Sequence, residues 1–168
     1  MSLKRKMLPI GVENFEKLRR NDMYYVDKTE MISDLIMNHG DANLFTRPRR
    51  FGKTLTMDML KTFFEIGQDA SLFDGLTISS HSDICEKYQN KYPVVFISLK
   101  GATGSTYEKA DSMIKQLVAE EYQRHSYLAD SDILDSIEKD QFNRIRSISL
   151  NEGDLENSLR TLTRLLCK

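Results

Sequence analysis

The sequence predicts an α/β layered fold with a parallel sheet. Two apolar segments, 42–46 and 93–99, have the composition of short buried strands. The second segment contains Val94-Val95-Phe96-Ile97, and a continuous run rich in β-branched residues suits a parallel strand that is buried on both faces. Strands that alternate with helices favour a parallel sheet covered by helices. We therefore expect the order strand, helix, strand, helix, helix, helix.

The segment ahead of the first strand is expected to contain loops, turns and one amphipathic helix. Loops and turns are expected over residues 7–29, where Asp27 and Glu30 stand three apart ahead of an apolar run that contains Met31, Ile32, Leu35 and Ile36. This spacing is typical of a capping box at the start of a helix. An acid, a lysine and a threonine side by side also suggest chemistry, although capping alone accounts for Asp27 and Glu30.

A helix is expected directly after the first strand. Between Lys53 and about Ile66, apolar residues recur at intervals of four, four and three and form one face, namely Leu55, Met59, Phe63 and Ile66. Such a stripe of Met and Phe is typical of a helix that faces the core. Residues 71–92 are expected to be irregular.

Three more helices are expected after the second strand. Ser105 and Glu108 form a second capping box, so the turn at 101–105 is expected to be structural. A helix over 130–147 is expected to face inward through Ile133, Leu134 and Ile137. The last helix is expected to start near 151–154 and to present one apolar face that consists of Leu155, Leu159, Leu162 and Leu166.

Composition narrows the classes of protein that this chain can be. Its 168 residues suit one domain, and its net charge of −1 produces no general attraction to nucleic acid or anionic lipid. The longest apolar runs fall short of the roughly 20 residues of a membrane span, so no membrane partner is expected. The two cysteines lack metal-ligand spacing and are expected to be free thiols in a reducing cytoplasm.

Residues 47–54 carry most of a phosphate-binding pattern. The general form is G-x-x-x-x-G-K-[ST] between a strand and a helix; Gly52, Lys53 and Thr54 match it, and Arg47 replaces the first glycine. Glycine lets the backbone approach phosphate, and the free amides at a helix start attract anions. Lys53 is expected to reach the outer phosphates and Thr54 to bind Mg²⁺. The predicted nucleotide site consists of Arg49, Arg50, Gly52, Lys53, Thr54 and Leu55.

Several stretches together resemble the predicted AAA-ATPase-like family of bacteria. They are 8–15 (LPIGVENF), 25–29 (YVDKT) and 47–55 (RPRRFGKTL), with 72–76 (LFDGL) and 92–99 fitting as well, and the resemblance covers nearly the whole chain. Arginine in place of the first glycine agrees with that family's own loop. The resemblance implies a P-loop NTPase-like fold, ATP as the nucleotide and Mg²⁺ as its ion. It also implies a C-terminal nuclease-like domain of the PD-(D/E)XK type in many members, and through it a nucleic-acid partner.

A second motif that such a site needs does not occur in the sequence. Hydrolysis requires an apolar strand that ends in Asp, often Asp-Glu, yet 94–99 ends in Lys100. The resemblance implies that the acidic strand follows a leucine-rich helix like 155–166. We therefore expect residues 1–168 to be the N-terminal part of one domain, truncated before that Walker B strand, with an N-terminal segment at 7–41 and a partial nucleotide-binding core at 42–168. Weak or absent hydrolysis follows, as does an exposed sheet edge that favours an oligomer.

Two alternatives use the same residues differently. A nucleic-acid-binding or regulatory module would use Arg47, Arg49, Arg50 and Lys53 as a basic patch on phosphodiester. The loop lacks interleaved aromatic residues for base stacking, so this alternative ranks lower. A pure interaction scaffold would be indifferent to nucleotides, phosphates and these substitutions.

Overall fold

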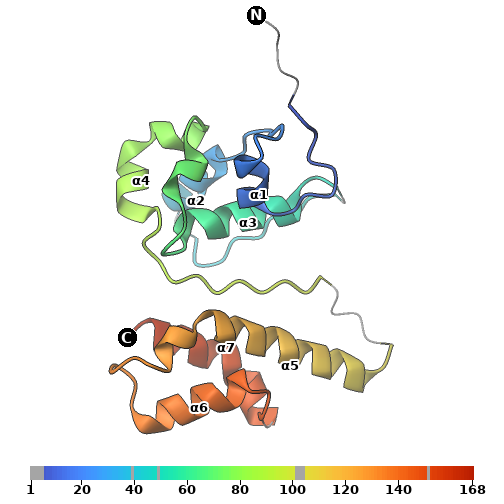
Figure 1. The fold of residues 1–168 in the computed structure, drawn as a ribbon, viewed down its shortest axis with the longest axis vertical. Coiled ribbons are helices and arrows are strands. Elements are labelled where there is room, and N and C mark those ends of the chain that lie inside the picture. The colour runs from blue at the N-terminus through green and yellow to red at the C-terminus, as the bar shows by residue number, and fades with distance from the viewer. Residues whose placement is uncertain (1–5, 39, 49, 101–104, 151) are drawn as a thin grey trace, which may run out of the picture. The chain divides into compact units, whose positions relative to one another are not determined.

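The chain divides into two compact units, which are shown in Figure 1. The computed structural model describes residues 6–38, 40–48, 50–100, 105–150 and 152–168. The N-terminal unit is Met1–Val94 and the C-terminal unit is Val95–Lys168. Within the described residues there are seven α-helices and three short 3-10 helices.

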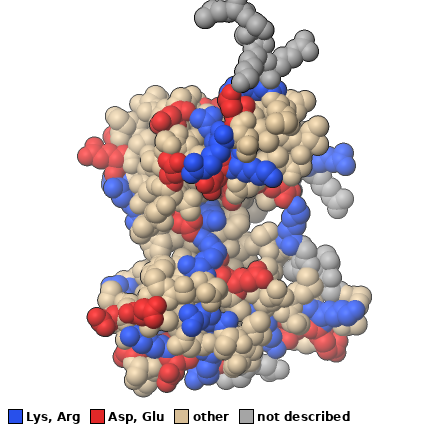
Figure 2. Space-filling view, in the orientation of Figure 1, with Lys and Arg blue, Asp and Glu red and all other residues tan. Residues whose placement is uncertain are grey.

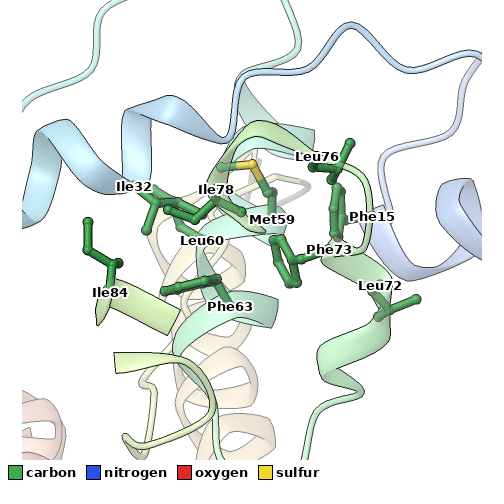
Figure 3. Close-up of a cluster of buried hydrophobic side chains, with 10 residues drawn as sticks. All are labelled: Phe15, Ile32, Met59, Leu60, Phe63, Leu72, Phe73, Leu76, Ile78 and Ile84. Atoms are coloured by element: carbon green, nitrogen blue, oxygen red, sulfur yellow. The ribbon is translucent and has the colours of Figure 1, made fainter. Parts of the chain in front are cut away.

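The N-terminal unit is built around one helix that follows the predicted phosphate loop. Its elements are α1 (Phe15–Arg20), α2 (Glu30–Asn38), α3 (Lys53–Phe64), η1 (Ala70–Phe73), η2 (Thr77–Ser80) and α4 (Ser82–Tyr88). Figure 3 shows the core cluster, to which α3 contributes Met59, Leu60 and Phe63. The ring of Phe73 lies 5.2 Å from that of Phe63. The core therefore fixes α3 along its buried face and leaves its first turn at the surface.

A single carboxylate joins α1 to α3. Asp58 on α3 accepts a 2.6 Å hydrogen bond from the backbone N–H of Phe15, at the start of α1. Phe15 is completely buried, and its ring lies 5.0 Å from the ring of Phe73. The start of α1 is thereby held by both a polar and an apolar contact.

The C-terminal unit is a helical cluster with its own core. Its elements are α5 (Tyr107–Arg124), η3 (Ser126–Leu128), α6 (Ser136–Arg146) and α7 (Glu152–Leu166). The ring of Tyr122 on α5 lies 4.9 Å from that of Phe142 on α6. The hydroxyl of Tyr122 donates a buried 2.7 Å hydrogen bond to the carbonyl of Ser158 on α7. Tyr122 thus connects all three long helices of this unit.

The predicted parallel sheet is wrong for the described part of the chain. Residues 43–48 and 93–99 are extended but belong to no strand, and one isolated parallel bridge joins Glu65 to Tyr92. An extended segment becomes a strand only when a neighbour completes its ladder, and β propensity reports only that a residue fits a half-buried pleated surface. Leu44 is 88% exposed and Leu99 is 69% exposed, so these apolar ends lack the burial that a central strand would have.

The helix predictions fared better. The helices expected from Lys53 and near the C-terminus are confirmed as α3 and α7, although Asn151 lies outside the described residues. The expected inward face of the first helix is confirmed, because Met31, Ile32, Leu35 and Ile36 all belong to or pack against the core. The loop prediction for 7–29 missed α1, and the irregular prediction for 71–92 missed α4. Helices of six and seven residues are marginal alone, and only tertiary packing makes them stable.

Two details of the sequence interpretation need correction. The side chain that caps α5 is Thr106 and not Ser105, and the turn residues 101–104 lie outside the described part of the chain. Helix α6 exists, but Ile133 and Ile137 are 63% and 78% exposed because the helix begins only at Ser136, which sets a different inward face. The buried residues of α6 are Glu138, Phe142 and Ile145, and Leu134, which was also expected to face inward, is buried just before the helix.

Candidate functional site

The first turn of α3 is the centre of the candidate site. Gly52 precedes the helix in the left-handed conformation, with φ 75° and ψ 24°, and no side chain caps the helix start. Arg50 is also left-handed, with φ 68°. The first backbone bond of the helix runs from the N–H of Thr56 to the carbonyl of Gly52 at 2.9 Å. The amides of Lys53, Thr54 and Leu55 therefore have no partner within the helix and are available to an anion.

Two lysines contact the loop from different parts of the chain. Lys53 Nζ donates a 2.8 Å hydrogen bond to the carbonyl of Arg47. Lys28 Nζ donates a 3.2 Å hydrogen bond to the carbonyl of Phe51. Both lysine residues are exposed. The loop carbonyls thus hold two ammonium groups beside the start of α3.

A network around Asp27 fixes the backbone on either side of Lys28. One oxygen of the Asp27 carboxylate accepts from the N–H and hydroxyl of Thr29, at 2.8 and 2.7 Å. The other accepts from the N–H and hydroxyl of Thr77, at 2.7 and 2.8 Å. Partial burial raises the pKa of Asp27, but the hydrogen bonds from Thr29 and Thr77 outweigh it and hold that pKa below its ordinary value.

This network corrects the interpretation of Asp27 and Glu30 as a capping box. The carboxylate of Asp27 accepts hydrogen bonds from Thr29 and Thr77 and does not cap the N–H of Glu30. Glu30 Oε2 instead lies 3.1 Å from His81 Nε2, so it does not return to the backbone of Asp27. Asp27 and Glu30 thus stabilise the contact of α2 with η2 and His81. The spacing of the two residues in the sequence could not show this long-range role.

Two hollows meet at Lys53. The larger, of about 670 Å³, is lined by residues 9–13, Arg50 and residues 52–55. The smaller, of about 340 Å³, is lined by apolar side chains and by charged ones, which are Lys28, Glu30, Asp34, Arg47 and Lys53. Lys53 contributes to both, so its ammonium can serve a ligand in either hollow.

The structure brings most of the predicted site residues together. Arg50, Gly52, Lys53, Thr54 and Leu55 all line the larger hollow, whereas Arg49 lies outside the described residues. Sequence reasoning missed Lys28 as a neighbour of the loop and residues 9–13 as its facing wall. The stretches around both belong to the resemblance, but nothing in their spacing indicated proximity to residues 47–54.

The arrangement suits an anion with several oxygens. Free amides, the guanidinium of Arg50 and the ammonium of Lys53 are all donors to phosphate. Among the described residues, no group of three or more His, Cys, Asp or Glu side chains could hold a metal ion. The half-buried Thr54 fits the pattern of a single hydroxyl ligand, with the other oxygens of a Mg²⁺ shell coming from phosphate and water.

Comparison with known proteins identifies the family. A sequence model described as Predicted AAA-ATPase matches residues 9–166. The chain belongs to the predicted AAA-ATPase family. Membership supports the coarse prediction of an ATPase-like module.

A curated relative of this predicted AAA-ATPase is the uncharacterized protein in the vnfD 5′ region of Azotobacter chroococcum mcd 1. It is 36% identical over 117 residues, which is 69% of this chain. The matched part is 21% of the relative, so the chain spans about a fifth of that protein's length. No solved structure matches the chain significantly. Among the described helices of this family member, none is long and apolar enough to cross a membrane.

Proposed function

We propose that this chain binds the phosphates of ATP at residues 47–55, as the nucleotide-binding part of an ATPase-like protein. The observation that carries the proposal is the Gly52-Lys53-Thr54 sequence at the start of α3, where no side chain caps the helix. Polyphosphate binding would satisfy the free amides and place negative charge at the positive end of the helix dipole. Family membership supports ATP as the nucleotide.

Each predicted residue has a physical role in this proposal. Gly52 is left-handed, so the chain turns into α3 without the strain that a side chain would add. Lys53 exchanges the carbonyl of Arg47 for phosphate oxygens, which are stronger acceptors because they are charged. Thr54 offers its hydroxyl to the Mg²⁺ ion that accompanies the nucleotide. Arg50, and Arg49 on sequence grounds, add positive charge beside the loop.

The proposal is for nucleotide binding and not for hydrolysis by this chain. No Asp or Asp-Glu follows an apolar strand-like run in the sequence, and such acids hold Mg²⁺ and orient the attacking water. We therefore expect binding without appreciable turnover by residues 1–168. The nuclease-like domain, the nucleic-acid partner and the cytoplasmic location stay predictions for the whole protein. The oligomer also stays a prediction, and the described residues provide no sheet edge for it.

Charge on the surface does not favour the alternative of a basic nucleic-acid patch. Figure 2 shows Lys and Arg beside Asp and Glu on the visible face of each unit. Carboxylates also occur around the loop, since Glu13 lines the larger hollow and Glu30 and Asp34 line the smaller. A compact polyphosphate on the amides of α3 avoids these acids better than a long duplex would.

Thermal unfolding with and without Mg-ATP tests the proposed function. At 100 times its Kd, a ligand stabilises the protein by about 2.7 kcal/mol, which raises the Tm of a chain of this size by about 5–10 °C. We expect this shift in the wild type and in Lys17→Ala, a control that removes an exposed lysine from α1. We expect Lys53→Ala to abolish it.

Other results would reject the proposal or select the alternative. No shift at millimolar Mg-ATP contradicts nucleotide binding by this chain. A shift that needs no Mg²⁺, fades with salt and falls equally in Lys53→Ala and Arg50→Ala indicates a basic patch. Turnover that Lys53→Ala abolishes would show that the expectation of weak hydrolysis is wrong.

A further inference from the structure

Lys28 has a position that its local sequence does not explain. It lies 23 residues before Phe51, yet its ammonium reaches the carbonyl of that loop residue at 3.2 Å. A Cβ built on Gly52 would lie 3.4 Å from the same nitrogen atom. The amine is therefore adjacent to the residue that precedes α3.

Both neighbours of Lys28 are held tightly while Lys28 itself is exposed. Thr29 is completely buried, and its hydroxyl accepts a 3.1 Å hydrogen bond from the N–H of Ile78. Asp27 accepts four hydrogen bonds from Thr29 and Thr77. These contacts explain an acid at 27 and a threonine at 29, but they place no requirement on residue 28. What they do is point a long side chain from a fixed backbone toward the loop.

The charges around this amine favour an anionic ligand. Three cations, Lys28, Arg47 and Lys53, line the smaller hollow together with two carboxylates. Of those carboxylates, Glu30 lies 3.1 Å from His81 Nε2, so one of the two has a partner of its own. A neutral carbonyl is a weaker partner for an ammonium group than a phosphate oxygen. Lys28 and Lys53 each bond a loop carbonyl and line one hollow, so a single polyphosphate could recruit both.

We propose that Lys28 is a second phosphate-binding lysine, which contacts the outermost phosphate of the bound nucleoside triphosphate. This proposal rests on the proposed function. Lys53, on the first turn of α3, contacts the phosphates nearest the helix amides. Lys28 approaches from the segment before α2, on the side of the smaller hollow. Asp27 and Thr29 act as positioning residues because they fix the backbone from which Lys28 extends.

Calorimetric titration of the chain with Mg-ATP and Mg-ADP tests the assignment. Lys28→Met keeps the aliphatic stem and removes the charge, Lys28→Arg keeps the charge, and Lys17→Met is a matched control on α1. We expect Lys28→Met to weaken ATP binding at least tenfold and ADP binding much less, so that the ratio of the two affinities falls. We expect Lys28→Arg to restore most of the ratio and Lys17→Met to leave it unchanged.

A purely structural role for Lys28 gives a different result. In that case Lys28→Met lowers the Tm of the unliganded protein and weakens ATP and ADP equally, which overturns the proposal. An unchanged ATP affinity in Lys28→Met also overturns the assignment of Lys28. If Lys53→Ala still abolishes ATP binding in that case, the proposed function stays intact. Failure of the wild type to bind either nucleotide rejects both proposals together.

Discussion

The helices α5 and α6 of the C-terminal unit begin in a different way from α3 of the N-terminal unit. In the C-terminal unit, Asp135 accepts a hydrogen bond from the N–H of Glu138 and the Glu138 carboxylate accepts one from the N–H of Asp135. Thr106 caps α5 in the same unit. In the N-terminal unit, α3 starts at a left-handed glycine that has no side chain to offer. The comparison teaches that polar side chains close the starts of α5 and α6, whereas the start of α3 stays open to a ligand.

The largest effect is expected from breaking one core at a time. Phe63 and Phe142 are completely buried, one in each unit. Phe63→Ala and Phe142→Ala should each cost about 3–5 kcal/mol in the stability of its own unit, because the cavity is only partly refilled. Hydrogen exchange of backbone amides, read for each unit separately, measures the effect. Equal loss of protection across both units in both variants would contradict the division at Val94 and Val95.

A smaller effect should distinguish the two kinds of helix start. Asp135→Ala removes a capping side chain and should cost about 0.5–2 kcal/mol. Gly52→Ala should also destabilise, by about 1–2 kcal/mol, because an L-residue is strained in the left-handed region. Urea titration of the two variants provides the measurement. A gain of stability in Gly52→Ala would show that the chain enters α3 in some other conformation.

The smallest expected effect is on the loss of folding stability at low pH. Burial raises the pKa of Glu121, but the adjacent His125 and the hydrogen bonds from the N–H of Phe96 and from Arg124 outweigh it and lower that pKa. The pKa of Asp27 is lowered similarly by its hydrogen bonds from Thr29 and Thr77. A carboxyl whose folded pKa is depressed stabilises the fold fully above its unfolded pKa of about 4, and this contribution is lost as pH falls through the folded pKa.

Neutral variants test this dependence in each unit. Between pH 7 and pH 3, Glu121→Gln and Asp27→Asn should each lose less stability than the wild type, although both start from a lower value at pH 7. Chemical unfolding at a series of pH values measures the slope. A slope identical to that of the wild type would mean that the acid sensitivity comes from other carboxyls.

How much the sequence could predict depends on whether a feature is local. The periods of α3 and α7 are properties of consecutive residues, and both helices are confirmed, although Ile66 and Leu159 of the expected apolar faces are 59% and 44% exposed. A strand depends on a neighbour, so the apolar content of 93–99 could not establish a sheet. In place of a hydrogen bond to a neighbouring strand, the N–H of Phe96 donates to the carboxylate of Glu121 at 2.8 Å.

The candidate site divides in the same manner. Arg50, Gly52, Lys53 and Thr54 are neighbours in sequence, and the loop pattern identified all of them. Lys28 comes to the loop through the contacts of Thr29 and Asp27 with the distant residues Thr77 and Ile78. Residues that contact each other across about 50 positions form no short sequence motif. The spacing of Asp27 and Glu30 therefore indicates only a local cap.

The two lysine contacts to the loop also bear on how fast an anion can bind. The bonds from Lys53 to the carbonyl of Arg47 and from Lys28 to the carbonyl of Phe51 already restrict the unliganded loop. Much of the conformational entropy of ordering is then lost during folding and not upon association. Capture of an anion becomes an exchange of acceptors on a preorganised surface, which favours association rates set by diffusion and charge and leaves affinity to be decided by dissociation.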